Sequence, residues 1–341
     1  MNVDLSVIVI GRNEAKTLNT VFGRFKELCA CAKWKCRLIY VDSDSSDSSI
    51  SIAMSFKKQN PECDIRIFGL QGNINASVAR NVGIQNMDPH SNYVFFLDAD
   101  IVFDVAFVDE AIGTLEQNPN IGTVSGTLTD SFDAPGTQAV MRPIAQSMKG
   151  RGRLWHGGNF IAKRHVVENV GRFDMSLVRH QDIDYSFRIR NAGYVLWMAR
   201  MRMGTHYTTA YMSLPRVIHN LRQGHYTYSG LLFRKHLMSR RCIDASRATS
   251  GVLFRCFVLC CVGIAFFFRP AGIVALAGFI FILSRKSGAR GESLRSRALS
   301  FVAGIQFVRG LFKPRGTAAG YRLRAISPSV LPTGHEEREN V

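Results

Sequence analysis

Several common sequence signatures are missing from this chain of 341 residues. None of its eight cysteines forms a C-x-x-C pair, which argues against a zinc ribbon or a thioredoxin-like motif. Neither G-x-G-x-x-G nor G-x-x-x-x-G-K-S/T follows a strand-like segment, which disfavours a dinucleotide-dependent oxidoreductase and a P-loop NTPase. The N-terminus has no basic segment before its first apolar run, so we expect no secretory signal peptide, and we expect reduced thiols.

Acidic residues are scarce in the C-terminal part of the chain. Residues 1–199 contain 21 basic and 21 acidic side chains, whereas residues 200–341 contain 22 basic and 5 acidic ones. The whole net charge of +17 therefore arises in residues 200–341. This asymmetry predicts a neutral catalytic body and a basic C-terminal region that meets an anionic partner, either an acidic membrane surface or nucleic acid.

Apolar runs alternate with helical patterns through the first third of the chain. Strand-like runs begin near residues 6, 37, 65 and 93, a spacing of about thirty residues that is typical of a β-α-β unit. We therefore predict an α/β fold with a mostly parallel sheet flanked by helices. Ligands of such sheets bind at the carboxyl ends of the strands.

A long apolar segment follows this part of the chain. Gly251–Leu283 contains two charged residues, and Arg269–Pro270 divides it into pieces shorter than the ~20 residues that a spanning helix needs. We predict an apolar helical hairpin that associates with the membrane, with a transmembrane segment or a buried hairpin of a soluble protein as alternatives. Basic residues on both flanks predict that both ends of the segment, and the catalytic domain, lie on the cytoplasmic side of the cell (inner) membrane.

These patterns divide the chain into four parts. Residues 1–215 are the predicted catalytic domain, and residues 216–250 are a basic juxtamembrane segment. Residues 251–284 are the membrane-associated hairpin or transmembrane segment. Residues 285–341 are a basic tail, in which residues 299–312 have the pattern of an interfacial helix before a disordered end.

The strongest chemical signal is Leu97-Asp98-Ala99-Asp100. Its two carboxylates directly follow the fourth strand-like run, where ligands of a parallel sheet bind. Carboxylate oxygens suit Mg²⁺ or Mn²⁺, which would bridge to substrate phosphates. An acidic pair of this kind can also simply cap a loop, and the position at the strand end favours the metal site.

Other polar residues lie near the ends of neighbouring strands. Asp42 follows the second strand and is suited to accept hydrogen bonds from a nucleobase or ribose, although it can also cap the next helix. Asn13 and Glu14 follow the first strand with the same ambiguity. Arg80 precedes the fourth strand and is either a contact to base or phosphate or a solvated arginine.

The ordered set of motifs resembles the inverting family 2 glycosyltransferases with a GT-A fold. The motifs are GRNEA, VDSDSSD, ASVARNVGI and LDAD, and the likeness continues through residues 157–160, 170–174 and 181–194 to cover about residues 4–210. The resemblance implies a GT-A-type nucleotide-diphospho-sugar transferase fold and a nucleotide-sugar donor. It implies that the donor site is formed by Asn13, Glu14, Asp42, Arg80 and Asp98.

The same resemblance implies the roles of the catalytic residues. Asp98 and Asp100 would hold the metal with the donor diphosphate, and His206 matches a histidine that is a further metal ligand in some members, an ordinary packed histidine being the alternative. The aspartate of the family's Glu-Asp pair, the general base, corresponds to Asp182, and Gln181 replaces the glutamate. Asp184 is the alternative base.

Four residues are assigned to the acceptor side. Trp155 lies in a glycine-rich loop and is suited to stack on an acceptor sugar, with a packed aromatic as the alternative. Gly158, Asp184 and Arg188 complete this group, and a solvated helix face is the alternative for Arg188.

Direct displacement at an anomeric carbon needs a base on the acceptor hydroxyl and positive charge on the departing nucleoside diphosphate. We predict a membrane-associated inverting glycosyltransferase that uses Mg²⁺ or Mn²⁺ and acts on a lipid-linked or polysaccharide (glycan) acceptor. The alternatives are a metal-dependent phosphoesterase or nucleotidyltransferase and a catalytically silent basic membrane scaffold. Nucleic-acid binding is disfavoured, because no RNP, zinc or helix-turn-helix pattern accompanies the basic segments, and the sequence leaves the donor sugar and the oligomeric state open.

Overall fold

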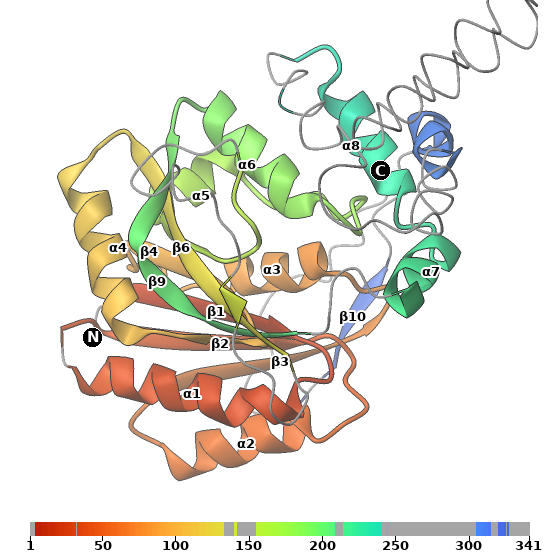
Figure 1. Cartoon of the computed structure of the whole chain (residues 1–341). Coiled ribbons are helices and arrows are strands. Elements are labelled where there is room, and N and C mark those ends of the chain that lie inside the picture. The colour runs from red at the N-terminus through yellow and green to blue at the C-terminus, as the bar shows by residue number, and fades with distance from the viewer. Residues whose placement is uncertain are drawn as a thin grey trace, which may run out of the picture.

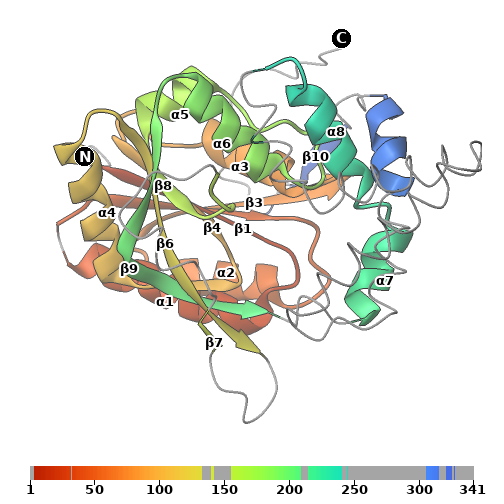
Figure 2. The ribbon, with the colours of Figure 1, turned by 45° about the horizontal axis from the view of Figure 1, so that its top comes forward.

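The structure is a computed structural model that describes residues 4–31, 33–132, 140–141, 155–208, 214–239, 244, 305–314, 320–324 and 326. One sheet of ten strands forms its centre, and helices cover both faces of the sheet (Figures 1 and 2). The strands are β1 (Leu5–Gly11), β2 (Cys36–Asp42), β3 (Asp64–Gly72), β4 (Tyr93–Asp98), β5 (Ile101–Phe103), β6 (Ile121–Phe132), β7 (Val140–Met141), β8 (Phe160–Lys163), β9 (Val195–Thr208) and β10 (Tyr321–Arg324). The helices are α1 (Ala15–Ala30), α2 (Ser49–Gln59), α3 (Ala76–Gln85), α4 (Val105–Gln117), α5 (Arg164–Val170), α6 (Gln181–Asn191), α7 (Leu214–Arg222) and α8 (Thr227–His236). Residues 305–312 form a further helix.

The first four strands confirm the predicted α/β organisation. They lie in the order β3-β2-β1-β4, and each neighbouring pair is parallel. The register places Gly11 opposite Asp42 and Ile10 opposite Asp98. The carboxyl ends of β1, β2 and β4 therefore meet at one edge of the sheet.

The rest of the sheet corrects the prediction of a mostly parallel arrangement, because the whole sheet is mixed. β8 is antiparallel to β4 and β6, β5 is antiparallel to β9, and β10 is antiparallel to β3, whereas β6 and β9 are parallel. A parallel neighbour needs a crossover of a dozen or more residues. Only two residues separate β4 from β5, so β5 joins the far end of the sheet against β9.

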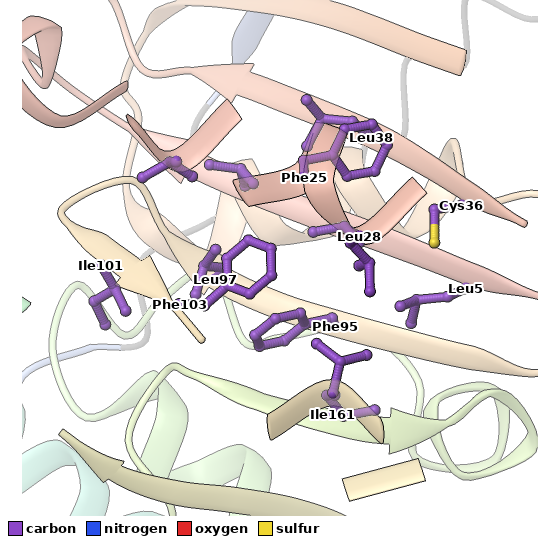
Figure 3. Close-up of a cluster of buried hydrophobic side chains, with 14 of the residues drawn as sticks. Leu5, Phe25, Leu28, Cys36, Leu38, Phe95, Leu97, Ile101, Phe103 and Ile161 are labelled. Atoms are coloured by element: carbon purple, nitrogen blue, oxygen red, sulfur yellow. The ribbon is translucent and has the colours of Figure 1, made fainter. Parts of the chain in front are cut away.

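The alternating side chains of β1 explain why both faces of the sheet are covered. Val7 and Val9 pack with α1 in one hydrophobic cluster, and Ile8 and Ile10 pack with α3 in another. Such burial on both faces is typical of parallel strands between helical layers. Figure 3 shows part of the first cluster, in which the α1 side chain of Phe25 lies near Leu38 of β2. This packing gives the strand ends a rigid support.

The C-terminal elements pack at one side of the sheet. Helix α8 and the helix at residues 305–312 lie side by side in both ribbon views (Figures 1 and 2). Gly230 and Gly310 permit this close approach, because a Cβ atom on Gly310 would lie 3.1 Å from the Cα atom of Gly230. Residues 305–312 fall within the predicted interfacial helix at 299–312.

The predicted hairpin at residues 251–284 lies outside the described residues. Among the helices that the structure does describe, none has the length and apolarity that crossing a membrane requires. The proposed domain boundaries stay predictions.

Candidate active site

A cavity of about 350 Å³ opens at the carboxyl edge of the parallel strands. Its lining includes four of the predicted donor and metal residues, Glu14, Arg80, Asp98 and Asp100. Gln181, the first residue of α6, also lines the cavity. The fold therefore brings together residues that are as much as 167 positions apart in the chain, from Glu14 to Gln181.

The carboxylate of Asp98 is held on both oxygens. Arg80 Nη2 donates to Asp98 Oδ1 at 2.6 Å, and Asn159 Nδ2 donates to Asp98 Oδ2 at 3.0 Å. Asn159 Oδ1 also accepts a hydrogen bond from the backbone N–H of Asp98 at 2.6 Å. Asn159 was given no role in the sequence analysis, although it lies in the quoted segment 157–160. It fixes the orientation of the first carboxylate of the acidic pair.

Arg80 is almost fully buried, with 3% of its surface exposed. Its Nη2 binds Asp98, whereas its Nε and Nη1 atoms have no hydrogen-bond partner among the residues that the structure describes. Unpaired buried donors are costly, and those of an arginine are well suited to phosphate oxygens. Arg80 is thus a buried cation with spare donors at the wall of the cavity, which rules out a solvated surface arginine.

Asp100 belongs to a second chain of polar contacts. Its Oδ2 lies 3.0 Å from His206 Nε2, and His206 Nδ1 lies 2.8 Å from Asp130 Oδ1. β5 and β9 bring these groups together, since Ile101 pairs with His206 and Asp130 of β6 pairs with the same residue. The other oxygen of Asp100, Oδ1, is buried and has no partner among the described residues. His206 therefore orients Asp100, and Oδ1 is available to a ligand.

Burial and nearby carboxylates raise the pKa of two acidic side chains in and beside the cavity. Burial, together with repulsion from Asp100 and Asp98, raises the pKa of Glu14 from 4.5 to about 7. Burial also raises the pKa of Asp182, and Asp98 adds to this effect while Arg80 opposes it. Asp182 thus shares the electrostatic environment of Asp98 and Arg80, although it does not line the cavity itself.

Two residues that were predicted to contact the nucleoside instead form hydrogen bonds with the loop after β2. Asp42 is 2% exposed, and its oxygens accept hydrogen bonds from the Tyr40 hydroxyl at 3.0 Å and from Ser45 Oγ and N–H at 2.6 and 2.9 Å. Asn13 has a left-handed backbone with φ of 60°, and its Oδ1 accepts from the backbone N–H of Ser46 at 2.8 Å. Neither residue lines the cavity. They shape the two loops beside it.

The four residues assigned to the acceptor side do not gather at one surface. Trp155 packs edge-on against Phe187 with ring centroids 6.4 Å apart. Gly158 lies against Arg80 and Asp98, because a Cβ atom there would be 2.9 Å from Arg80 Cζ and 3.3 Å from Asp98 Oδ2. Asp184 and Arg188 form an ion pair at 3.0 Å inside α6. Gly158 is therefore placed beside the acidic pair, on the donor side.

Asp184 is fully buried in a cluster of cations. Besides Arg188, it accepts from Lys235 Nζ and from His236 Nε2 of α8, each at 2.9 Å. The hydrogen bond from His236 and the charges of Lys235 and Arg188 outweigh burial and hold the pKa of Asp184 well below its ordinary value. Sequence reasoning missed Lys235 and His236, because they lie about fifty residues further along the chain. The cluster fixes α6, and Asp184 is not open to an acceptor.

Replacing Asp184 with asparagine is expected to lower the free energy of unfolding by about 3 kcal/mol, because Arg188 loses its carboxylate partner, Lys235 keeps only Asp174 of its two described carboxylate partners, and His236 loses a buried acceptor. The folded-state pKa of Asp184 lies below the ordinary 3.8, so this stabilisation is present at neutral pH and is lost only as the pH falls below 3.8 toward the folded value. Urea unfolding at several pH values measures the difference. The matched control is Glu168→Gln, which breaks an exposed i,i+4 pair with Arg164 and should cost under about 0.5 kcal/mol. Equal effects of the two variants would contradict this role of Asp184.

Adding a methyl group at Gly158 is expected to displace Arg80 from Asp98. A displaced Arg80 no longer presents its donors to an anionic ligand, and loss of a hydrogen bond to a charged group costs about 1.5–3 kcal/mol, roughly a 10- to 150-fold weaker affinity. Gly157→Ala is the matched control, since a Cβ atom on Gly157 meets nothing within 4 Å. Titration calorimetry with nucleoside diphosphate and Mn²⁺ compares the two variants. Similar affinities in Gly158→Ala and Gly157→Ala would show that the contact of Gly158 with Arg80 does not matter.

Comparison with known proteins agrees with this geometry. The sequence model described as glycosyl transferase family 2 matches residues 6–170. The glycosyltransferase AglE of Haloferax volcanii is 26% identical over 211 residues, which cover 59% of this chain and 66% of AglE. The poly-β-1,6-N-acetyl-D-glucosamine synthase of Staphylococcus epidermidis is 24% identical over 200 residues, 56% of this chain and 46% of the synthase. The matches thus span less than two thirds of either relative.

Two solved glycosyltransferases share the fold over nearly the whole chain. The mannosyltransferase PcManGT from Pyrobaculum calidifontis, solved with GDP-Man and Mn²⁺, has a TM-score of 0.61 at 16% identity and covers 92% of this chain and 88% of its own. S. aureus TarS 1–349, solved with UDP-GlcNAc, has a TM-score of 0.54 at 14% identity, with 90% and 89% covered. The α/β fold with its mixed sheet is therefore of the GT-A type.

Proposed function

Because the glycosyl transferase family 2 model matches residues 6–170 and a relative is named as a glycosyltransferase, we propose that the protein is a glycosyltransferase that moves a sugar from a nucleotide-sugar donor to an acceptor hydroxyl by direct displacement, with inversion at the anomeric carbon. The observation that carries the proposal is the gathering of Asp98, Asp100, Glu14 and buried Arg80 around one cavity, with Asp182 in the same electrostatic environment. The match to this family disfavours the phosphoesterase and scaffold alternatives.

The residues at the acidic pair fit a divalent cation. Asp100 Oδ1 is a buried carboxylate oxygen without a partner among the described residues, and the donor set of Asp98 and Asp100 consists of oxygens, which Mg²⁺ and Mn²⁺ prefer. In the described part of the chain, no three His, Cys, Asp or Glu side chains form a preassembled metal site. This fits Mg²⁺-type binding, in which one or two carboxylates are completed by substrate phosphates. We propose that His206 orients Asp100 rather than binding the cation.

Within this proposal Asp98 and Asp100 would hold the metal, which would supply positive charge for the leaving nucleoside diphosphate. Arg80 adds two further N–H donors for the diphosphate from the buried wall of the cavity. Gly158 leaves room for the Arg80 guanidinium beside Asp98. Asn159 and Arg80 keep the Asp98 carboxylate in a single orientation. The donor diphosphate would therefore meet preorganised groups.

We assign the role of general base to Asp182 rather than Asp184. Burial raises the pKa of Asp182, and a base is most efficient when its pKa lies closer to the working pH. Asp184 is unsuited to this role, since its two oxygens are bound by Arg188, Lys235 and the imidazole of His236, and these contacts lower its pKa. Asp182 would take the proton of the acceptor hydroxyl as that oxygen bonds to the anomeric carbon and the bond to the diphosphate breaks.

For the acceptor we propose a lipid-linked sugar or a growing polysaccharide at the cytoplasmic face of the cell membrane. The basic C-terminal region supports this proposal, because Lys and Arg residues next to a membrane favour its anionic cytoplasmic leaflet. The relative from Staphylococcus epidermidis is named as a polysaccharide synthase, which is consistent with the proposal for this chain. The apolar residues 251–284 are the proposed membrane contact.

The proposal is tested by a donor and acceptor screen. Purified full-length protein is mixed with each of a set of UDP- and GDP-sugars and Mn²⁺, and thermal shift identifies the donor through its stabilisation of the native state. With that donor, nucleoside diphosphate release should rise when a lipid or polysaccharide fraction is added, and the product linkage should be inverted by NMR. Release that ignores the acceptor, or a product with retained configuration, would contradict direct transfer.

A further inference from the structure

One side of the molecule carries basic and apolar side chains and no acidic ones. Residues 214–239 and 305–314 contain no Asp or Glu. They contain six Lys and Arg residues, namely Arg216, Arg222, Arg234, Lys235, Arg309 and Lys313. Figures 1 and 2 show that α7, α8 and the helix at residues 305–312 lie together at this side. Acidic partners of these cations must therefore come from other segments, as Asp174 and Asp184 do for Lys235.

The helix at residues 305–312 is attached to α8 by its small and aromatic residues. Phe307 is 1% exposed and packs against Phe233 of α8, with ring centroids 6.0 Å apart. Gly310 lies against Gly230. Gln306 Nε2 donates to the backbone oxygen of Leu221 at 2.6 Å, which ties the helix to α7. This face of the helix is therefore packed against α7 and α8.

The other face of this helix presents apolar side chains to solvent. Ile305, Val308 and Phe312 are 50%, 39% and 79% exposed. Their spacing of three and then four residues places them on one side of the helix. Beside them lies a groove of about 500 Å³, lined by Val308, Arg309, Phe312, Lys313, Gln223, Gly224 and Thr227. We refer to Ile305, Val308, Arg309, Phe312 and Lys313 as the docking face.

We propose that the docking face binds the surface of an anionic lipid bilayer. Exposed apolar residues interleaved with cations are the pattern of a helix that lies in the membrane interface, with its apolar side chains at the boundary between headgroups and acyl chains. Arg309 and Lys313 would meet lipid phosphates there, and each cation near such a surface adds to the attraction. A nucleic acid would satisfy the cations but offers no apolar phase for Ile305, Val308 and Phe312.

The docking face is connected to the proposed base through α8. Its helix packs on α8, and the last two residues of α8, Lys235 and His236, bind Asp184 of α6. Asp184 lies two residues beyond Asp182. Contact with a bilayer would therefore hold the catalytic cavity at a fixed place relative to the membrane. The inference deepens the proposed membrane-bound acceptor and rests on it, but fluorescence quenching by lipid, its main readout, needs neither donor nor acceptor.

The test places a fluorescent reporter on the docking face of the full-length protein. In Phe312→Trp, the added indole is expected to be quenched by brominated lipids in vesicles that contain 30% phosphatidylglycerol, beyond the quenching of the native tryptophans in the wild type. Reversing the charges with Arg309→Glu and Lys313→Glu should reduce this extra quenching several-fold at physiological salt. The extra quenching measures contact between the docking face and the lipid, even if other parts of the chain also bind the vesicle.

Two control variants make the result specific. Val178→Trp places the same reporter on another exposed apolar position, 38% exposed, and should show no extra quenching. Lys26→Glu with Lys33→Glu reverses two exposed charges, on α1 and just after it, and should leave the quenching of Phe312→Trp unchanged. Absence of extra quenching in Phe312→Trp, or equal quenching in neutral phosphatidylcholine vesicles, would overturn the proposal. A response to single-stranded DNA without quenching by brominated lipid would instead indicate nucleic-acid binding.

Donor binding separates this inference from the proposed function. The charge-reversed variant should keep the thermal shift with nucleotide sugar and Mn²⁺, because the docking face does not line the catalytic cavity. If the charge-reversed variant loses the extra quenching but still binds the donor, the effect of the substitutions is confined to the docking face. Quenching without any donor binding would count against the glycosyltransferase site and leave the docking face standing.

Discussion

Replacing Asp182 with asparagine is expected to lower kcat by about 10²–10⁴-fold, the usual contribution of a general base. The asparagine has nearly the same shape but cannot take the proton of the acceptor hydroxyl. Donor affinity should change little, because the proposed contacts of the donor diphosphate are Arg80 and the acidic pair, and not Asp182. Steady-state turnover and calorimetric titration of the donor measure the two quantities separately. The wild-type rate should also rise with pH through an apparent pKa above the ordinary aspartate value of 3.8, as burial of Asp182 requires.

Asp44→Asn is the matched control for this prediction. Asp44 is an exposed carboxylate in the loop after β2, near the same edge of the sheet, and its φ of 61° is one that asparagine tolerates. This control should keep the wild-type kcat. If Asp182→Asn retained more than about a tenth of the wild-type rate, a general base worth at least 10²-fold could not be Asp182.

The second large effect is expected at Asp100. Asp100→Asn should lower turnover by about 10³-fold, within the range that removal of a single charge-stabilising group costs. Asparagine can keep the contact with His206, but it removes the negative charge at the buried oxygen that has no partner among the described residues. The stabilisation of the protein by Mn²⁺ with nucleoside diphosphate, measured by thermal shift, should be lost together with the activity.

Asp104→Asn tests whether loss of any nearby carboxylate has this effect. Asp104 pairs with half-exposed Arg202 at 2.8 Å and lies four residues beyond Asp100. Its replacement should leave both turnover and the thermal shift with Mn²⁺ almost unchanged. An Asp100→Asn variant with wild-type metal dependence would show that the cation does not need this carboxylate.

The first half of the fold could be predicted from the sequence because its signals are local. The largely apolar β1 and the regular spacing of the next three strands indicated a parallel sheet, and that sheet placed Asp98 at the carboxyl edge. The second half could not be predicted in the same way. β6 and β9 are separated by more than sixty residues in the chain and pair with shifts in register. No regular sequence repeat indicates such a pairing.

The residues of the candidate site also differ in how far the sequence predicted them. Asp98, Asp100, Arg80 and Glu14 lie where their position after or before a strand indicated, at the lining of one cavity. Asn13 and Asp42 were placed at the right edge, but nearby serines of the loop compete for their side chains. Short polar side chains often form such local bonds.

Other contributions to the site come from distant parts of the chain. Asn159 reaches Asp98 from just before β8, Asp130 reaches His206 from β6, and Lys235 and His236 reach Asp184 from α8. Their residue types alone gave no signal, because the contacts depend on the tertiary packing. This explains why Asp184 and Arg188 resembled acceptor-side residues in the sequence and form a buried ion pair in the structure.

We propose that the acidic pair after β4 holds a divalent cation together with the donor diphosphate. Crystals of the full-length protein grown with Mn²⁺ and a nucleoside diphosphate test it through the anomalous signal of manganese. The account predicts one manganese peak within about 2.0–2.3 Å of a carboxylate oxygen of Asp98 or Asp100, bridged to the diphosphate beside Arg80. A manganese peak elsewhere, or a nucleoside diphosphate bound away from Arg80 and the acidic pair, would contradict it.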